Sequence, residues 1–148
     1  MSDVTTLGQR WRTLDQLHRE IEAHIERELQ VHLGLSAREF LALSLLQQHN
    51  TYTSVRHWLY EVAAEVGLSQ SATSRLVTRL RERKLLTRRT SDHDRRTADV
   101  ELTAAALDLL QRGIPVFEEA LRAAVTPARY PPESLRLLQY LQGHVDQP

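Results

Sequence analysis

One stretch, residues 68–102, restricts the possible folds more than any other part of the chain, because it predicts a helix followed at once by a β-hairpin. Ser69 suits the N-cap of this helix, since its hydroxyl can accept a hydrogen bond from a free N–H group of the first turn. At about 100° per residue, small and apolar side chains gather on one face of the helix. This predicted core face contains Ala72, Thr73, Leu76, Val77 and Leu80.

The opposite face of the same helix is small, polar and rich in hydrogen-bond donors. It contains Gln70, Ser71, Ser74, Arg75 and Thr78. Such a face can enter the major groove of DNA, where arginine pairs with guanine and glutamine or serine read base edges more loosely. An ordinary solvated helix face has a similar composition, and the helix alone does not distinguish the two interpretations.

The hairpin favours the first interpretation. Its strands are predicted at residues 86–90 and 97–102, and the turn S-D-H-D-R-R between them ends in Arg95 and Arg96. An arginine at a hairpin tip can reach the narrow minor groove beside a docked helix, and we expect Arg96 to do so. Asp94 is expected to shape the tip. Phosphate contacts are predicted for Arg79, Arg88 and Arg89.

Charge is concentrated in the same stretch. Residues 69–100 carry nine basic and four acidic side chains, a net charge of +5, in a chain whose formal total is zero. The remainder therefore carries −5. A neutral protein with its positive charge collected on one helix and one hairpin is suited to binding a polyanion such as double-stranded DNA.

The remaining segments predict a mainly α-helical chain of one domain, residues 1–148. Further helices are predicted at residues 5–33, 36–49, 60–66, 103–125 and 133–145 from glycines, from apolar residues three and four apart, and from N-caps at Ser36, which forms a capping box with Glu39, and at Thr103. The predicted order is α-α-α-α-β-β-α-α, which describes a winged helix-turn-helix lobe over residues 35–103. Pro115 is expected to kink its helix or to break a hydrogen bond near Gln111.

The long helices at residues 5–33 and 104–146 present more apolar surface than one small domain can cover. We therefore expect them to be dimerisation helices in a homodimer.

The segment 50–59 is the hardest to interpret. It is polar and β-branched with several aromatic rings, and it suits either a plain connecting loop or one wall of a ligand pocket. Aromatic content alone selects five candidate residues for binding a small-molecule effector: Trp11, His18, Tyr52, His57 and Trp58.

Several classes of chemistry are not expected. The chain has no cysteine, which excludes disulfides, thiolate metal sites and thiol-based redox sensing. The seven histidines are scattered without the close helical spacing of a metal pair, so we predict no metal and no cofactor. No nucleophile motif or paired-carboxylate spacing indicates an enzyme. With no signal-peptide pattern and no apolar run of about 20 residues, a cytoplasmic protein without a membrane span is expected.

Four segments together resemble the multiple-antibiotic-resistance regulator (MarR) family of winged-helix transcription factors. They are V-A-A-E-V-G-L-S-Q-S-A-T-S-R-L-V-T-R-L-R-E-R from Val62, L-S-A-R-E-F-L-A-L at 35–43, D-R-R at 94–96 and E-L-T at 101–103. The resemblance implies a homodimer with interleaved terminal helices, recognition helices in successive major grooves, and relief of DNA binding by a small molecule. It also implies that Asp94 and Arg96 form the wing motif. The family usually has glycine where Lys84 stands, so an irregular helix end is expected there.

Two functional hypotheses follow. The first is a dimeric, ligand-responsive transcriptional regulator that binds a pseudo-palindromic operator. A repressor is expected rather than an activator. The alternative is a winged-helix protein-interaction module without DNA binding, against which the basic hairpin tip and the carboxylate-poor helix face argue.

Overall fold

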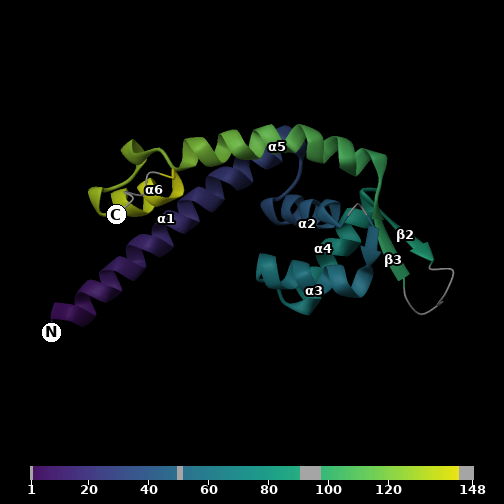
Figure 1. Cartoon of the computed structure of the whole chain (residues 1–148), viewed down its shortest axis with the longest axis horizontal. Coiled ribbons are helices and arrows are strands. Elements are labelled where there is room, and N and C mark those ends of the chain that lie inside the picture. Colours follow the sequence, from purple (N-terminus) through teal and green to yellow (C-terminus); the bar gives the residue numbers. More distant parts are fainter. Residues whose placement is uncertain (1, 50–51, 91–97, 144–148) are drawn as a thin grey trace.

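The computed structural model describes residues 2–49, 52–90 and 98–143 and is mainly α-helical with a small antiparallel sheet (Figure 1). Its elements in chain order are α1 (Ser2–Leu33), α2 (Ala37–Gln48), β1 (Tyr52–Ser54), α3 (Val55–Val66), α4 (Gln70–Glu82), β2 (Leu86–Thr90), β3 (Ala98–Leu102), α5 (Ala104–Ala124), two 3₁₀ turns (Pro127–Arg129 and Pro132–Ser134) and α6 (Leu135–Leu141). The predicted fold class, a winged helix-turn-helix core with long terminal helices, is confirmed. Among the helices of these ranges, none is long and apolar enough to cross a membrane.

The molecule has two parts that share one core. Helices α1 and α5 lie side by side, with α6 beside α1, while α2, α3, α4 and the sheet form a lobe below α5 (Figure 1). Leu29 of α1, Leu43 and Leu46 of α2, and Leu110 of α5 are fully buried where the two parts meet. A smaller cluster of Leu17, Val125 and Leu138 holds the terminal helices together.

The sheet has the strand order β1-β3-β2, with both pairs antiparallel. The predicted hairpin is confirmed, with Leu86 opposite Leu102 and Arg88 opposite Val100. The additional strand β1 pairs Tyr52 with Glu101 and lies in the segment 50–59, so the interpretation of this segment as a plain loop is wrong.

The same segment contains the start of α3, which begins at Val55 and not near residue 60 as predicted. The sequence carries no clear signal for the start of α3. Ser54 forms no side-chain capping bond, and β-branched residues precede the helix. The buried positions are Trp58 and Val62, one turn apart. The Trp58 indole Nε1 donates to the Ala42 carbonyl at 3.1 Å, which holds α3 against α2.

The predicted N-caps are confirmed at three helices. Ser36 and Glu39 form a reciprocal capping box at α2, with both hydrogen bonds at 3.0 Å. The Ser69 hydroxyl accepts from Ala72 N–H at α4, and the Thr103 hydroxyl accepts from Ala106 N–H at α5, both at 3.2 Å. Each bond satisfies an N–H group that has no partner within its own helix.

The end of α4 is regular, and the expectation of an irregular end at Lys84 is wrong. Lys84 adopts the left-handed conformation with φ 58°, the region that glycine occupies most easily. Its N–H donates to Arg81 C=O and the Leu85 N–H donates to Leu80 C=O, both at 2.9 Å. This is the Schellman pattern, and buried Leu85 supplies its apolar contact. Lysine adopts the backbone geometry that would normally select glycine.

Helix α5 continues through Pro115, although proline has no N–H to donate to Gln111 C=O. Gly113, two residues earlier, lies against α2 and the end of α1. A β-carbon added there would lie 2.5 Å from Phe40 Cε2 and 2.8 Å from Leu33 Cδ1. The closeness of α5 to α1 and α2 therefore depends on this glycine. Helix α6 is shorter than the predicted 133–145, since its first residues form a 3₁₀ turn.

Candidate nucleic-acid interface

Helix α4 presents the predicted polar face to solvent. Gly67, at φ 66°, ends α3 in the left-handed conformation and turns the chain into the N-cap of α4. Thr73, Leu76 and Leu80 are buried in the core beneath the helix. The predicted base-reading residues all lie exposed on the other side: Gln70, Ser71, Ser74, Arg75 and Thr78.

The hydrogen bonds of this face determine what it can offer a ligand. The Thr78 hydroxyl donates to Ser74 C=O at 3.0 Å, so its oxygen remains available mainly as an acceptor. The hydroxyls of Ser69 and Ser71 lie 3.2 Å apart. Arg75 forms no ion pair with any residue that the structure describes. Its guanidinium therefore keeps its donors for an external partner such as a guanine edge.

Arg79 differs from Arg75, because Glu39 of α2 lies beside it. Arg79 Nε is 3.6 Å from Glu39 Oε1, and Arg83 Nη1 is 3.2 Å from Glu39 Oε2. The same carboxylate accepts the Ser36 N–H of the capping box. Glu39 thus joins α2 to the end of α4 and offsets part of the Arg79 charge. Sequence reasoning assigned Glu39 only its cap, because no local signal marks a partner about 40 residues away.

The first strand of the hairpin extends the basic surface. A groove of about 520 Å³ lies between α4 and β2 and is lined by Thr78, Arg81, Glu82, Leu86, Thr87 and Arg88. Arg81 was not among the predicted contacts, although the sequence count of basic residues includes it. The side chain of Arg89 and residues Asp94, Arg95 and Arg96 lie outside the part of the molecule that the structure describes.

A second groove, of about 650 Å³, lies between α3 and α4. It is lined by Ser54, Arg56, His57, Leu59, Tyr60, Ala63, Gln70, Thr73 and Ser74. Arg56 and the Tyr60 ring are exposed there, next to the predicted reading residues Gln70 and Ser74. The exposed face of α3 thus adds polar and aromatic groups that sequence reasoning did not select, because the helix start was placed too late.

The five residues predicted to line an effector pocket do not share one cavity. Trp58 is a core residue with no exposed surface. Trp11 lies in a groove between α1 and α6, and His57 lies in the groove between α3 and α4. His18 is exposed on α1, and Tyr52 pairs in β1 with its side chain outside the description. Aromatic content alone could not separate core rings from surface rings.

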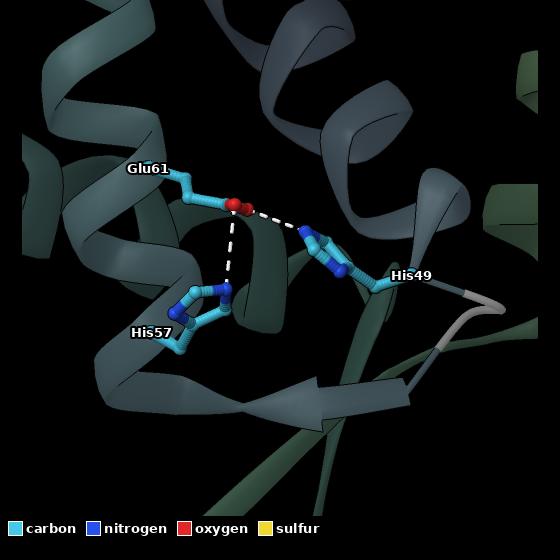
Figure 2. Close-up of side chains that lie close together, drawn as sticks. All are labelled: His49, His57 and Glu61. Carbon is cyan, nitrogen blue, oxygen red and sulfur yellow. Dashed lines mark hydrogen bonds and ion pairs between the residues drawn. The ribbon is translucent and has the colours of Figure 1, made fainter.

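His49 and His57 were predicted to be scattered, and this is wrong. The structure brings both rings to the carboxylate of Glu61, where α2 ends against α3 (Figure 2). Only His57 and Glu61 are close in the sequence. His49 reaches them through the packing of α2 on α3, which no spacing rule predicts.

Comparisons with known proteins agree with this arrangement. A protein-family model described as the MarR family matches residues 33–97. No curated protein sequence matches the chain.

Similar folds occur among solved structures. The MarR-family transcriptional regulator Sco3205 from Streptomyces coelicolor, solved in complex with DNA, is 24% identical, with a TM-score of 0.68 over 90% of this chain and 81% of that one. AbsC from the same organism is 22% identical, with a TM-score of 0.70 over 95% and 90% of the two chains. BpsR from Bordetella bronchiseptica is 22% identical, with a TM-score of 0.64 over 91% of each. Residues 33–97 therefore resemble the MarR family, and the part of the chain that the structure describes has the same fold as these solved transcriptional regulators.

Proposed function

We propose that this protein is a DNA-binding transcriptional regulator that acts as a homodimeric repressor and leaves its operator when a small molecule binds. The observation that carries the proposal is the exposed, donor-rich face of α4, on which Arg75 has no internal ion-pair partner among the described residues. This face lies beside the basic β2 strand, within the stretch of net charge +5. A basic face of this kind attracts phosphates, and its polar side chains can read base edges.

Apolar surface on the terminal helices supports a homodimer. Leu7 and Trp11 of α1 are 68% and 64% exposed, and Leu141 of α6 is 52% exposed. The two helices adjoin here, because Leu7, Trp11 and Leu14 line one groove together with Leu137. An exposed apolar surface at this junction is typical of a protein interface. A two-fold dimer would carry two α4 helices and would require a pseudo-palindromic operator with half-sites about one helical turn apart.

The solved relatives support DNA binding and its control by a ligand. The Sco3205 structure contains DNA, and the BpsR structure is described by the regulation of its DNA binding by 6-hydroxynicotinic acid. We extend both properties to this chain. The proposal includes no enzymatic activity, because the similar proteins Sco3205 and AbsC are described as MarR-family transcriptional regulators.

The test begins with selection of duplex fragments by the purified full-length protein. Selected sites should be pseudo-palindromic, and affinity for selected and random duplex should fall steeply with salt, because bound arginines displace counterions from the phosphates. Arg75→Ala should weaken this binding, and Arg112→Ala is its matched control. Arg112 is an exposed arginine of α5 that pairs with Asp108 at 3.0 Å. Absence of any salt-dependent binding to duplex DNA would favour the protein-interaction module instead.

A further inference from the structure

A cluster of three side chains lies where the end of α2 meets α3. None of the three residues belongs to the base-reading face of α4. His57 and Glu61 stand one turn apart on α3, so their side chains project from the same side of the helix. His49 is the C-cap residue of α2 and faces them from the neighbouring helix (Figure 2). The two imidazole rings lie edge to face, with centroids 5.4 Å apart.

Both rings direct Nε2 at the same carboxylate. His49 Nε2 is 2.5 Å from Glu61 Oε2, and His57 Nε2 is 3.3 Å from Glu61 Oε1 (Figure 2). One potential ligand atom from each of the three residues lies within 4.8 Å of the other two. A tetrahedral ion with bonds of about 2.0–2.2 Å keeps its ligand atoms about 3.3–3.6 Å apart. Small side-chain rotations would therefore bring all three atoms to the separations that such an ion requires.

The backbone that carries these residues is well supported. Trp58, next to His57 in sequence, is fully buried and hydrogen-bonded to Ala42 of α2. The His49 N–H donates to Leu46 C=O at 3.1 Å. Ligands on packed helices keep a site more closely arranged than ligands on loops. The three side chains are 33%, 57% and 30% exposed, which leaves an approach for an ion and room for water in a fourth position.

We propose that His49, His57 and Glu61 bind one divalent transition-metal ion of the zinc class per chain and thereby tie the end of α2 to α3. Two imidazole nitrogens and one carboxylate oxygen suit Zn²⁺, Co²⁺ or Ni²⁺. Mg²⁺ and Ca²⁺ prefer sites made of oxygen ligands. The proposal is independent of the proposed function, because metal binding is measured without DNA.

The experiment uses the full-length protein after removal of metals by a chelator. Co²⁺ is added as a spectroscopic probe, since four-coordinate Co²⁺ absorbs visible light more strongly than the hydrated ion, and Zn²⁺ is titrated by calorimetry. The expected result is one ion per chain, with Zn²⁺ displacing Co²⁺ and Mg²⁺ having no effect at the same concentration. His57→Gln and Glu61→Gln should each weaken binding at least about 10-fold.

His32→Gln is the matched control. His32 Nε2 lies 3.4 Å from Glu28 Oε2, again four residues apart on one helix, and His32 is not part of a three-residue cluster in the described residues. The affinity of the His32→Gln variant for Zn²⁺ should equal that of the unchanged protein. Circular dichroism verifies the fold of each variant, and Zn²⁺ should raise Tm in the unchanged protein and in His32→Gln only. Absence of Zn²⁺ binding, or equal binding in Glu61→Gln, would overturn the proposal.

Discussion

Arg75 and Arg79 are both basic residues of α4, yet their surroundings assign them different roles. Arg75 has no ion pair among the described residues, whereas Arg79 lies 3.6 Å from the Glu39 carboxylate. Arg75→Ala is expected to weaken the binding free energy for the selected DNA site by about 1–3 kcal/mol and to relax base preference at one position per half-site. Arg79→Ala should weaken binding to all DNA sequences alike. It should lower the slope of log affinity against log salt concentration by at most about one unit, because Glu39 already offsets part of the Arg79 charge.

Binding of both variants to selected and random duplexes checks this assignment. If Arg79→Ala changed base preference while Arg75→Ala lowered both affinities equally, the two roles would be reversed.

Tyr130 provides the clearest dependence on pH. Burial raises the pKa of its phenol above the usual value, and the nearby Glu20 carboxylate adds to this, while Arg129 opposes it. The hydroxyl donates to Ala124 C=O at 2.5 Å. Since folding favours the neutral phenol, its contribution to stability is complete below pH of about 10 and is lost as the pH rises above this value.

Tyr130→Phe should therefore lower the free energy of unfolding by about 1 kcal/mol at pH 7, because Ala124 C=O loses its donor. The difference from the unchanged protein should narrow above pH 10, where the tyrosinate can no longer donate. Urea denaturation at pH 7 and at pH 10.5 measures both values. Tyr140→Phe, at an exposed position of α6, should show no such narrowing.

At the scale of elements, the position of α5 depends on Gly113. A methyl group there would press on Phe40, whose ring stacks on Phe117 with centroids 5.5 Å apart. Gly113→Ala should destabilise the protein by about 1–3 kcal/mol through overpacking, despite the better helix propensity of alanine. Gly8→Ala on α1 is the control, because a β-carbon there has no atom within 4 Å.

Chemical denaturation should give a negative change in unfolding free energy for Gly113→Ala, and a gain of up to about 1 kcal/mol for Gly8→Ala. Equal gains at both glycines would show that α5 has room to shift.

At the scale of the whole molecule, the exposed apolar surface of α1 and α6 predicts association. Replacing both Trp11 and Leu14 with Glu should prevent dimerisation, since two carboxylates would be buried in the interface without partners. Light scattering should then give a monomeric mass or unfolded chains, and operator binding should fall. Val31→Glu is a matched control, because Val31 is an apolar residue of α1 that is 77% exposed outside this surface. A double variant that remained a stable dimer would contradict this prediction.

The sequence by itself determined the features that depend on near neighbours. Caps at Ser36, Ser69 and Thr103 and the alternation of the hairpin were predicted, because capping bonds span three residues and the side chains of a strand repeat every two. The exposed face of α4 was predicted for the same reason, since helical periodicity alone separates it from Leu76 and Leu80.

Only the tertiary structure decided which distant groups meet. The pairing of Glu39 with Arg79, the contact of Gly113 with Phe40 and the meeting of His49 with Glu61 each join different helices. The burial of Trp58 and the pairing of β1 with β3 have the same origin. Such contacts depend on which helices and strands pack together, and the periodic pattern of each element marks its buried face without identifying the element that covers it.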